Sequence, residues 1–231
     1  NNRLCLGLDI DNSKLKNNSL NYMQDFIFDI IDATIDLCPI YKINFAFYEK
    51  HGSKGYNILE KISEKFDKNT ITIADAKRGD IGNSSTYYAD SIFEHFNFDS
   101  ITVSPYMGYD SILPFTLNKN KGVFVLCLTS NPGSVDIQNL KSNNSYVYEN
   151  VINMAVAIEL LHTASLVHDD IVDNATQRRG QKSFNNIYGN NMSEFRPIEN
   201  SDYTNYSVWQ TARKNWVYET VTGTYTPISF S

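Results

Sequence analysis

Apolar and polar residues follow two different patterns along the first 150 residues, one typical of buried strands and one typical of helices. Short apolar runs are separated by longer segments whose apolar residues recur at helical spacing. We predict five strands, at residues 4–9, 41–47, 71–77, 100–106 and 123–129. Helices are predicted between them, at residues 18–37, 56–67, 83–96 and 109–117. This order indicates an α/β fold with a parallel sheet, and we favour a (β/α)8-type barrel over an open doubly wound sheet.

Polar residues stand at the ends of these predicted strands, where barrel enzymes place their chemistry. Asp75 and Lys77 are two residues apart on one predicted strand, so both side chains should point to the same side. Lys42 arrives from the preceding strand, and a network of opposite charges lowers the cost of burying each member. For an isolated Asp-x-Lys, a structural ion pair at a strand end is the more common explanation.

The motifs around these residues are more specific as an ordered set than any one of them alone. They are LCLGLD, YKINFAF, DAKRGDIGN, TVSPYMGYDS and TSNPGS. Over residues 4–138 the set resembles the orotidine 5′-phosphate decarboxylase family, whose enzymes convert orotidine 5′-phosphate to UMP and carbon dioxide. The resemblance implies a barrel of eight strands, of which five are recognisable in this chain.

The resemblance also implies roles for particular residues. The family's alternating catalytic network corresponds to Lys42, Asp75, Lys77 and Asp80. In the family the last of these acids is contributed across a dimer interface, which implies a homodimer. Asp9 corresponds to the acid that holds the ribose hydroxyls, and Ser130 to the serine that bonds the pyrimidine. The implied substrate is a nucleotide and no cofactor is needed, because a positioned lysine ammonium can stabilise a carbanion and protonate it.

The resemblance fades after residue 150. Complete members would continue with glycine-rich phosphate-binding segments and with a late glutamine and arginine that grip the substrate phosphate. We find no PGIGAQ-like segment and no late GR motif in this sequence. Because contacts to a remote phosphate help to organise the reacting centre, we expect impaired turnover as well as weak binding.

Composition changes at the same point. Residues 1–150 carry 12 Lys and 2 Arg, whereas residues 151–231 carry 2 Lys and 4 Arg. We therefore predict a composite chain, which a natural fusion, an assembly error or a deliberate splice would each explain. Its expected parts are a barrel portion at residues 1–153, a helical segment at 154–189 and an aromatic-rich tail at 190–231 with short strands.

The helical segment contains the string HTASLVHDDIVDNATQRRG. Residues 154–189 resemble the first aspartate-rich motif of trans-polyprenyl diphosphate synthases. The resemblance implies Mg2+ ligands at Asp169, Asp170 and Asp173, and diphosphate contacts from Arg178 and Arg179. On spacing alone, three acids near a helix end are more often a solvated surface. The second aspartate-rich motif is absent, so a synthase fragment is the alternative function, and a chain without any complete site is a third.

Composition excludes other classes. Hydrophobic residues make up 42% and charged residues 20%, as in folded globular proteins. The net charge of −6 argues against a protein that coats nucleic acid. No apolar stretch reaches the roughly 18 residues of a membrane helix, and the first residues lack a signal-peptide layout. Three cysteines without metal spacing favour reduced thiols in a cytoplasmic protein.

Overall fold

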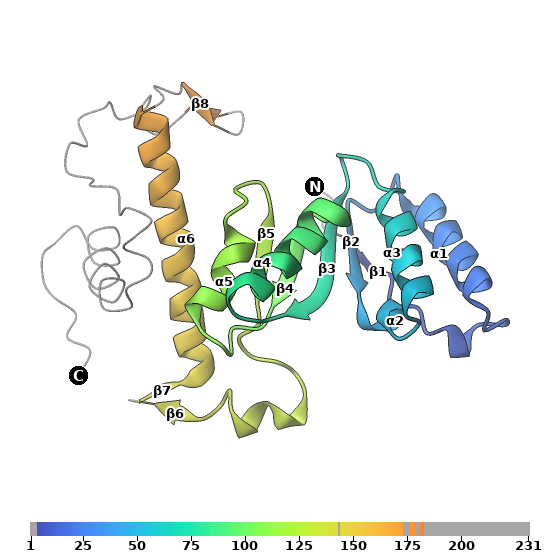
Figure 1. Ribbon diagram of the computed structural model, residues 1–231, viewed down its shortest axis with the longest axis horizontal. Helices are drawn as coiled ribbons and strands as arrows, with labels where there is room; N and C mark the ends of the chain where they lie inside the picture. Colours follow the sequence, from blue (N-terminus) through green and yellow to red (C-terminus); the bar gives the residue numbers. More distant parts are fainter. Residues whose placement is uncertain (1–3, 143, 173–175, 179–180, 183–231) are drawn as a thin grey trace, which may run out of the picture. The chain divides into compact units, whose positions relative to one another are not determined.

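The computed structural model describes residues 4–142, 144–172, 176–178 and 181–182 (Figure 1). The chain divides into two compact units, residues 1–129 and 130–231. The first unit carries a five-stranded parallel sheet with helices between its strands, so the predicted α/β class is confirmed.

The order of the strands in this sheet follows their order along the chain. They are β1 (Cys5–Gly7), β2 (Ile40–Asn44), β3 (Ile71–Arg78), β4 (Ser100–Val103) and β5 (Gly122–Val125). All four pairings are parallel, and each strand lies within or beside its predicted range. Within the described residues β1 and β5 each pair with one strand only, so the sheet has two open edges there.

The helices of the first unit follow the strands in turn. They are η1 (Asn12–Lys14), α1 (Leu20–Thr34), α2 (Ala46–Glu49), α3 (Ser53–Ser63), α4 (Gly82–Asp90), η2 (Ser91–His95) and α5 (Tyr109–Thr116). Helices α1 and α3 lie side by side, as do α4 and α5 (Figure 1). Several predicted boundaries are wrong by a few residues, and the second strand shows one physical reason. The strand expected at 41–47 ends at Asn44, whose side-chain oxygen accepts a hydrogen bond from Ala46 N (3.1 Å) at the first turn of α2.

Alternate residues of the strands are buried on the face that the helices cover. Tyr41 and Ile43 of β2 are fully buried, and the Tyr41 hydroxyl lies 2.7 Å from the hydroxyl of Thr34 on α1. Because side chains alternate along a strand, the residues between them belong to the other face. That face is more open: Ile71 is 50% exposed and Phe124 is 52% exposed. Lys42 and the polar ends of the neighbouring strands lie on it.

The described part of the second unit contains a long helix, α6 (Val147–Val172), which begins before the helical segment expected at residues 154–189. The shorter elements are η3 (Pro132–Asp136), β6 (Lys141–Ser142), β7 (Ser145–Tyr146), β8 (Gln177–Arg178) and β9 (Gln181–Lys182). The expected strands at 190–231 lie outside the described residues, and the division into three segments stays a prediction. Of the described helices, none has the length and apolar character needed to cross a membrane.

Gly55 allows α3 to begin close to α2. A Cβ atom at this position would lie 1.8 Å from the backbone oxygen of Tyr48. The Tyr48 side chain is fully buried, and its hydroxyl donates a hydrogen bond to Leu8 O (2.6 Å), immediately before Asp9. This contact joins α2 to the residue that directly follows β1.

We predict that Gly55→Ala strongly destabilises the chain. The new methyl group must displace backbone atoms, so we expect a loss of about 3 kcal/mol, the upper part of the usual range for overpacking. Urea unfolding followed by circular dichroism measures the change. Gly7→Ala is the matched control, because its new Cβ would meet no atom closer than 3.9 Å. Equal losses in the two variants would contradict this account of Gly55.

Candidate active site

Four charged side chains meet at the carboxyl end of three neighbouring strands. Asp9 follows β1, Lys42 lies on β2, and Asp75 and Lys77 lie on β3. Lys42 Nζ lies 3.2 Å from Asp9 Oδ2 and 3.3 Å from Asp75 Oδ2. Lys77 Nζ lies 2.6 Å from Asp75 Oδ1. The predicted meeting of Lys42, Asp75 and Lys77 is confirmed, and Asp9 extends it to an alternating cluster, which we call the charge cluster.

The charge cluster is more buried at its centre than at its ends. The side chain of Asp75 is 11% exposed, whereas that of Lys77 is 49% exposed. Burial alone would raise the pKa of Asp75, but hydrogen bonds from Lys77 and Thr102 and the charge of Lys42 lower it below its ordinary value. Partial burial would lower the pKa of Lys42, but the carboxylates of Asp9 and Asp75 raise it. In both groups the hydrogen bonds and opposite charges outweigh burial, so Asp75 and Lys42 are both favoured in their charged forms.

Strand β3 is irregular at the point where it carries the charge cluster. Ala74 is paired with Ile101, and Arg78 is paired with Val103. The chain therefore advances four residues along β3 where it advances only two along β4. Within this bulge Lys77 has φ = +49°, a left-handed conformation that costs an L-residue about 1–2 kcal/mol. Asp75 and Lys77 do contact each other as predicted, but through a bulge and not through the regular period of a strand.

Sequence reasoning missed Thr102 on β4. Its hydroxyl donates a hydrogen bond to Asp75 Oδ1 (2.9 Å) and accepts one from Lys77 N (3.0 Å). A signal was present, because Thr102 stands between the buried residues Ile101 and Val103 and so belongs to the open face. Its pairing with Lys77 depends on the bulge, which the sequence pattern does not reveal.

Arg78, also missed, anchors the chain directly after Lys77. Its guanidinium contacts the Glu49 carboxylate and lies 5.2 Å from the ring centre of Tyr88 and 5.8 Å from that of Phe45. An ion pair flanked by two rings holds a guanidinium from several sides. The end of β3 is therefore fixed on both sides of the strained residue.

Among the described residues of the first unit, Asp80 takes no part in the charge cluster. Asp80 follows β3, and its Oδ1 accepts a hydrogen bond from Ile81 N (2.8 Å). Among the described residues it forms no ion pair within 4.0 Å. Ser130 is exposed and begins the second unit. Their predicted roles stay predictions.

The residues of the predicted diphosphate site are only partly described. Asp169 and Asp170 lie on α6, and Arg178 lies on β8. Asp173 and Arg179 lie outside the described residues. Across the described ranges there is no group of three or more His, Cys, Asp or Glu side chains that could hold a metal ion, and the predicted triad is untested because it includes Asp173.

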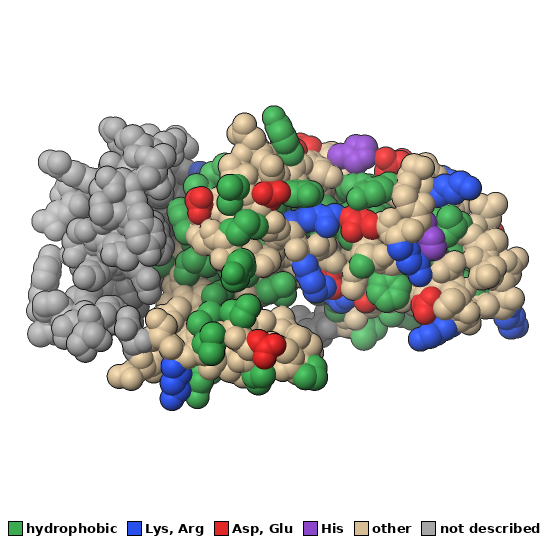
Figure 2. All heavy atoms as spheres, turned by 60° about the horizontal axis from the view of Figure 1, so that its bottom comes forward, with side chains coloured by type: hydrophobic (Ala, Val, Ile, Leu, Met, Phe, Trp, Pro, Cys, Tyr) green, Lys and Arg blue, Asp and Glu red, His purple; other side chains and the backbone are tan. Residues whose placement is uncertain are grey.

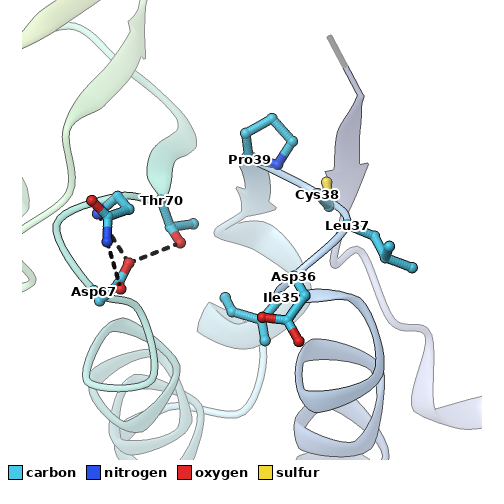
Figure 3. A pocket seen from close by; sticks show the side chains of 8 residues that line it. Ile35, Asp36, Leu37, Cys38, Pro39, Asp67 and Thr70 are labelled. Carbon is cyan, nitrogen blue, oxygen red and sulfur yellow. Dashed lines mark hydrogen bonds between the residues drawn. The ribbon is translucent and has the colours of Figure 1, made fainter. Parts of the chain in front are cut away.

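A pocket of about 510 Å³ lies at the opposite end of the sheet (Figure 3). It is lined by Ile35, Asp36, Leu37, Cys38, Pro39, Asp67, Asn69 and Thr70. These residues belong to the turns that precede β2 and β3, and the Asp67 carboxylate accepts hydrogen bonds from Asn69 and Thr70 within its own turn. Barrel enzymes act at the carboxyl ends of their strands, so this pocket is not the candidate site.

The described part of one face carries charges of both signs. On the face drawn in Figure 2, Lys and Arg side chains stand among Asp and Glu side chains, with hydrophobic side chains between them. No continuous basic patch covers the described part of that face, whereas a nucleic-acid interface is typically a basic stripe. This agrees with the net charge of −6.

Fold and site together define a parallel β/α protein with alternating lysines and aspartates at its strand ends. The family model of the orotidine 5′-phosphate decarboxylase / HUMPS family matches residues 2–163, so the chain belongs to that family. A second family model, polyprenyl synthetase, matches residues 129–221. Two matches on one chain are consistent with the predicted composite organisation.

Similar proteins agree with the first match. An orotidine 5′-phosphate decarboxylase of Flavobacterium johnsoniae is 49% identical over 156 residues, which are 64% of this chain and 57% of that protein. One of Dehalococcoides mccartyi is 43% identical, over 80% of this chain and 67% of that protein. The structure of Leishmania donovani OMP decarboxylase has a TM-score of 0.59 and 39% identity, over 64% of this chain and 58% of the other. The chain thus spans little more than half the length of the first relative.

The pKa directions predict how pH affects stability. Asp75 has a lowered pKa when folded, so its contribution is present above about pH 4 and is lost as pH falls through the folded pKa. Lys42 has a raised pKa, so its contribution is present below about pH 10.5 and is lost as pH rises through the folded pKa. We expect Asp75→Asn to lower stability at pH 7 and to weaken the loss of stability between pH 7 and pH 3.

Urea unfolding at a series of pH values measures this dependence. Asp25→Asn is the control, because Asp25 is an exposed carboxylate on α1. We expect the control to keep the acid dependence of the wild-type chain. An Asp75→Asn variant with unchanged acid dependence would show that the charge cluster contributes no pH-dependent stability.

Proposed function

We propose that this chain carries the reacting centre of an orotidine 5′-phosphate decarboxylase, which releases carbon dioxide from a pyrimidine nucleotide to give UMP. The observation that carries this proposal is the charge cluster, with Lys77 at its more exposed end. Membership of the family and the names of the similar proteins support it. Because the chain spans 57% of the first relative, the activity of a whole enzyme is part of the proposal.

In the proposed reaction the bond between the pyrimidine ring and its carboxylate breaks. Carbon dioxide leaves, and the electron pair of the broken bond stays on the ring carbon. The Lys77 ammonium stabilises this charge and then gives its proton to the same carbon. The neutral amine that results takes up a proton from water, so the cycle needs no other reactant.

The remaining members of the charge cluster support Lys77. Asp75 keeps the lysine charged and aimed, since its Oδ1 lies 2.6 Å from Lys77 Nζ. Lys42 neutralises the second oxygen of the same carboxylate at 3.3 Å. Asp75 would also repel the departing carboxylate, but we rank the electrostatic role of the lysine above this effect.

The other predicted residues complete the proposed site. Asp9 binds the ribose hydroxyls, and Ser130 bonds the pyrimidine. Asp80 acts in the site of a neighbouring subunit of a homodimer, which fits its position outside the charge cluster of its own chain. A cytoplasmic location is proposed too, supported by the three free cysteines.

We predict that the 231-residue chain binds UMP weakly and decarboxylates orotidine 5′-phosphate far more slowly than a complete enzyme, because its phosphate-binding segments are not recognisable. Lys77→Ala should lower the residual rate by about 100- to 10,000-fold, the usual contribution of a general acid or base. The loss of substrate absorbance measures the rate.

Lys61→Ala is the control for this assay, because Lys61 lies on α3 and bonds Gln24 away from the strand ends. Turnover that persists in Lys77→Ala would refute the proposed function. Robust turnover that depends on Lys77 would instead show that another segment grips the phosphate.

The polyprenyl synthetase match at residues 129–221 is the observation behind a second candidate, a polyprenyl diphosphate synthase fragment with the aspartate-rich motif. Only one such motif is recognisable, so any Mg2+ would be held by carboxylates on one side and water on the other. We predict no ordered Mg2+ at these residues without added diphosphate, and no prenyl transfer. Calorimetric titration with Mg2+ and pyrophosphate tests this. Tight binding that is lost in Asp170→Ala but kept in Asp25→Ala would move the synthase function to first place.

A further inference from the structure

The hydroxyl of Thr102 uses both of its hydrogen-bonding capacities within the charge cluster. It accepts a hydrogen bond from the backbone N–H of Lys77 (3.0 Å), so its own proton is available for Asp75 Oδ1 (2.9 Å). A single hydroxyl therefore holds the backbone of one cluster residue and the side chain of another. Thr102 reaches both from a different strand, β4.

The first of these hydrogen bonds acts where the backbone is strained. Lys77 has φ = +49°. It lies between Ala74 and Arg78, the two residues of β3 that pair with β4 on either side of the bulge. A left-handed lysine persists only where its surroundings hold it. The Thr102 hydroxyl gives the Lys77 N–H a partner inside the bulge, where the ladder between the two strands is interrupted.

The second hydrogen bond orients the carboxylate that Lys77 contacts. Asp75 Oδ1 accepts from both the Thr102 hydroxyl and Lys77 Nζ, whereas Oδ2 faces Lys42 Nζ at 3.3 Å. With its two oxygens assigned to different partners, the carboxylate has one favourable orientation. Thr102 therefore acts on Lys77 at two points. It binds the backbone N–H of the lysine directly, and it orients the Asp75 oxygen that lies 2.6 Å from the lysine ammonium.

We propose that Thr102 is a positioning residue, whose hydroxyl holds the strained Lys77 backbone and the Asp75 carboxylate so that the ammonium of Lys77 is aimed at the reacting carbon. Thr102 acts through these two residues and does not itself contact substrate. The catalytic part of this inference rests on the proposed decarboxylase function, whereas the geometric part does not.

The test compares Thr102→Val, which keeps the shape and removes the hydroxyl, with Thr102→Ser, which restores the hydroxyl. Thr72→Val is the matched control, because the Thr72 hydroxyl lies on the neighbouring strand and bonds Asp99 Oδ2 (2.8 Å), not the charge cluster. The first readout is the titration of the Asp75 carboxyl carbon by NMR in the full chain. The second is kcat and KM for orotidine 5′-phosphate.

In Thr102→Val we expect the pKa of Asp75 to rise, because the carboxylate loses a donor. We expect kcat to fall by about 10- to 100-fold with little change in KM, as for a misaligned catalytic group. Thr102→Ser should restore both values, and Thr72→Val should leave the titration of Asp75 unchanged. If Thr102→Val does not fold, Thr102→Ala replaces it in the same comparison.

An unchanged Asp75 titration in the folded Thr102→Val variant overturns the proposal, and so does a shift that Thr102→Ser fails to restore. The titration needs no substrate. A wild-type chain without turnover would therefore refute the proposed function, while the titration would still decide the role of Thr102.

Discussion

The buried carboxylate of Asp75 is the group on which the site depends. A negative charge that is 11% exposed is costly unless partners replace the water it has lost. Two lysines and one hydroxyl do so, and they come from three different strands. The ionised state of Asp75, the orientation of Lys77 and the registration of β3 against β4 are therefore coupled. Removal of any one partner leaves part of a buried charge uncompensated.

The parallel sheet makes this arrangement possible at little cost. Its strands all end at the same edge, so residues far apart in sequence become neighbours there without any long loop. Tyr48 on α2 links that helix to Leu8, and Arg78 links β3 to Glu49 of the same helix. These contacts fix the backbone on which Asp9 and Lys77 stand. The charged face can remain partly open because the opposite face carries the packing.

Much of the fold can be predicted from sequence, because buried strands and amphipathic helices leave different periodicities. The contact between Asp75 and Lys77 is expected from that pattern, but it is made through a bulge. The five strands and the approach of Lys42 to Asp75 follow from the pattern directly. The bulge in β3, the left-handed Lys77 and the role of Thr102 do not, since they depend on how two strands are registered. Glu49 is a similar case: its pairing with Arg78 arises only once α2 has formed beside the sheet.

The strands of the first unit have the same order in the sheet as along the chain, and this order bears on how the unit folds. Among the described residues, each strand of the five-stranded sheet pairs with its neighbours along the chain and with no other strand. Contacts between strands that are close in sequence lower the entropic cost of closing the loop between them, and this favours rapid folding. Each β/α pair can therefore dock on the one synthesised before it. The sheet can grow during translation, strand by strand, with the charge cluster completed when β4 arrives.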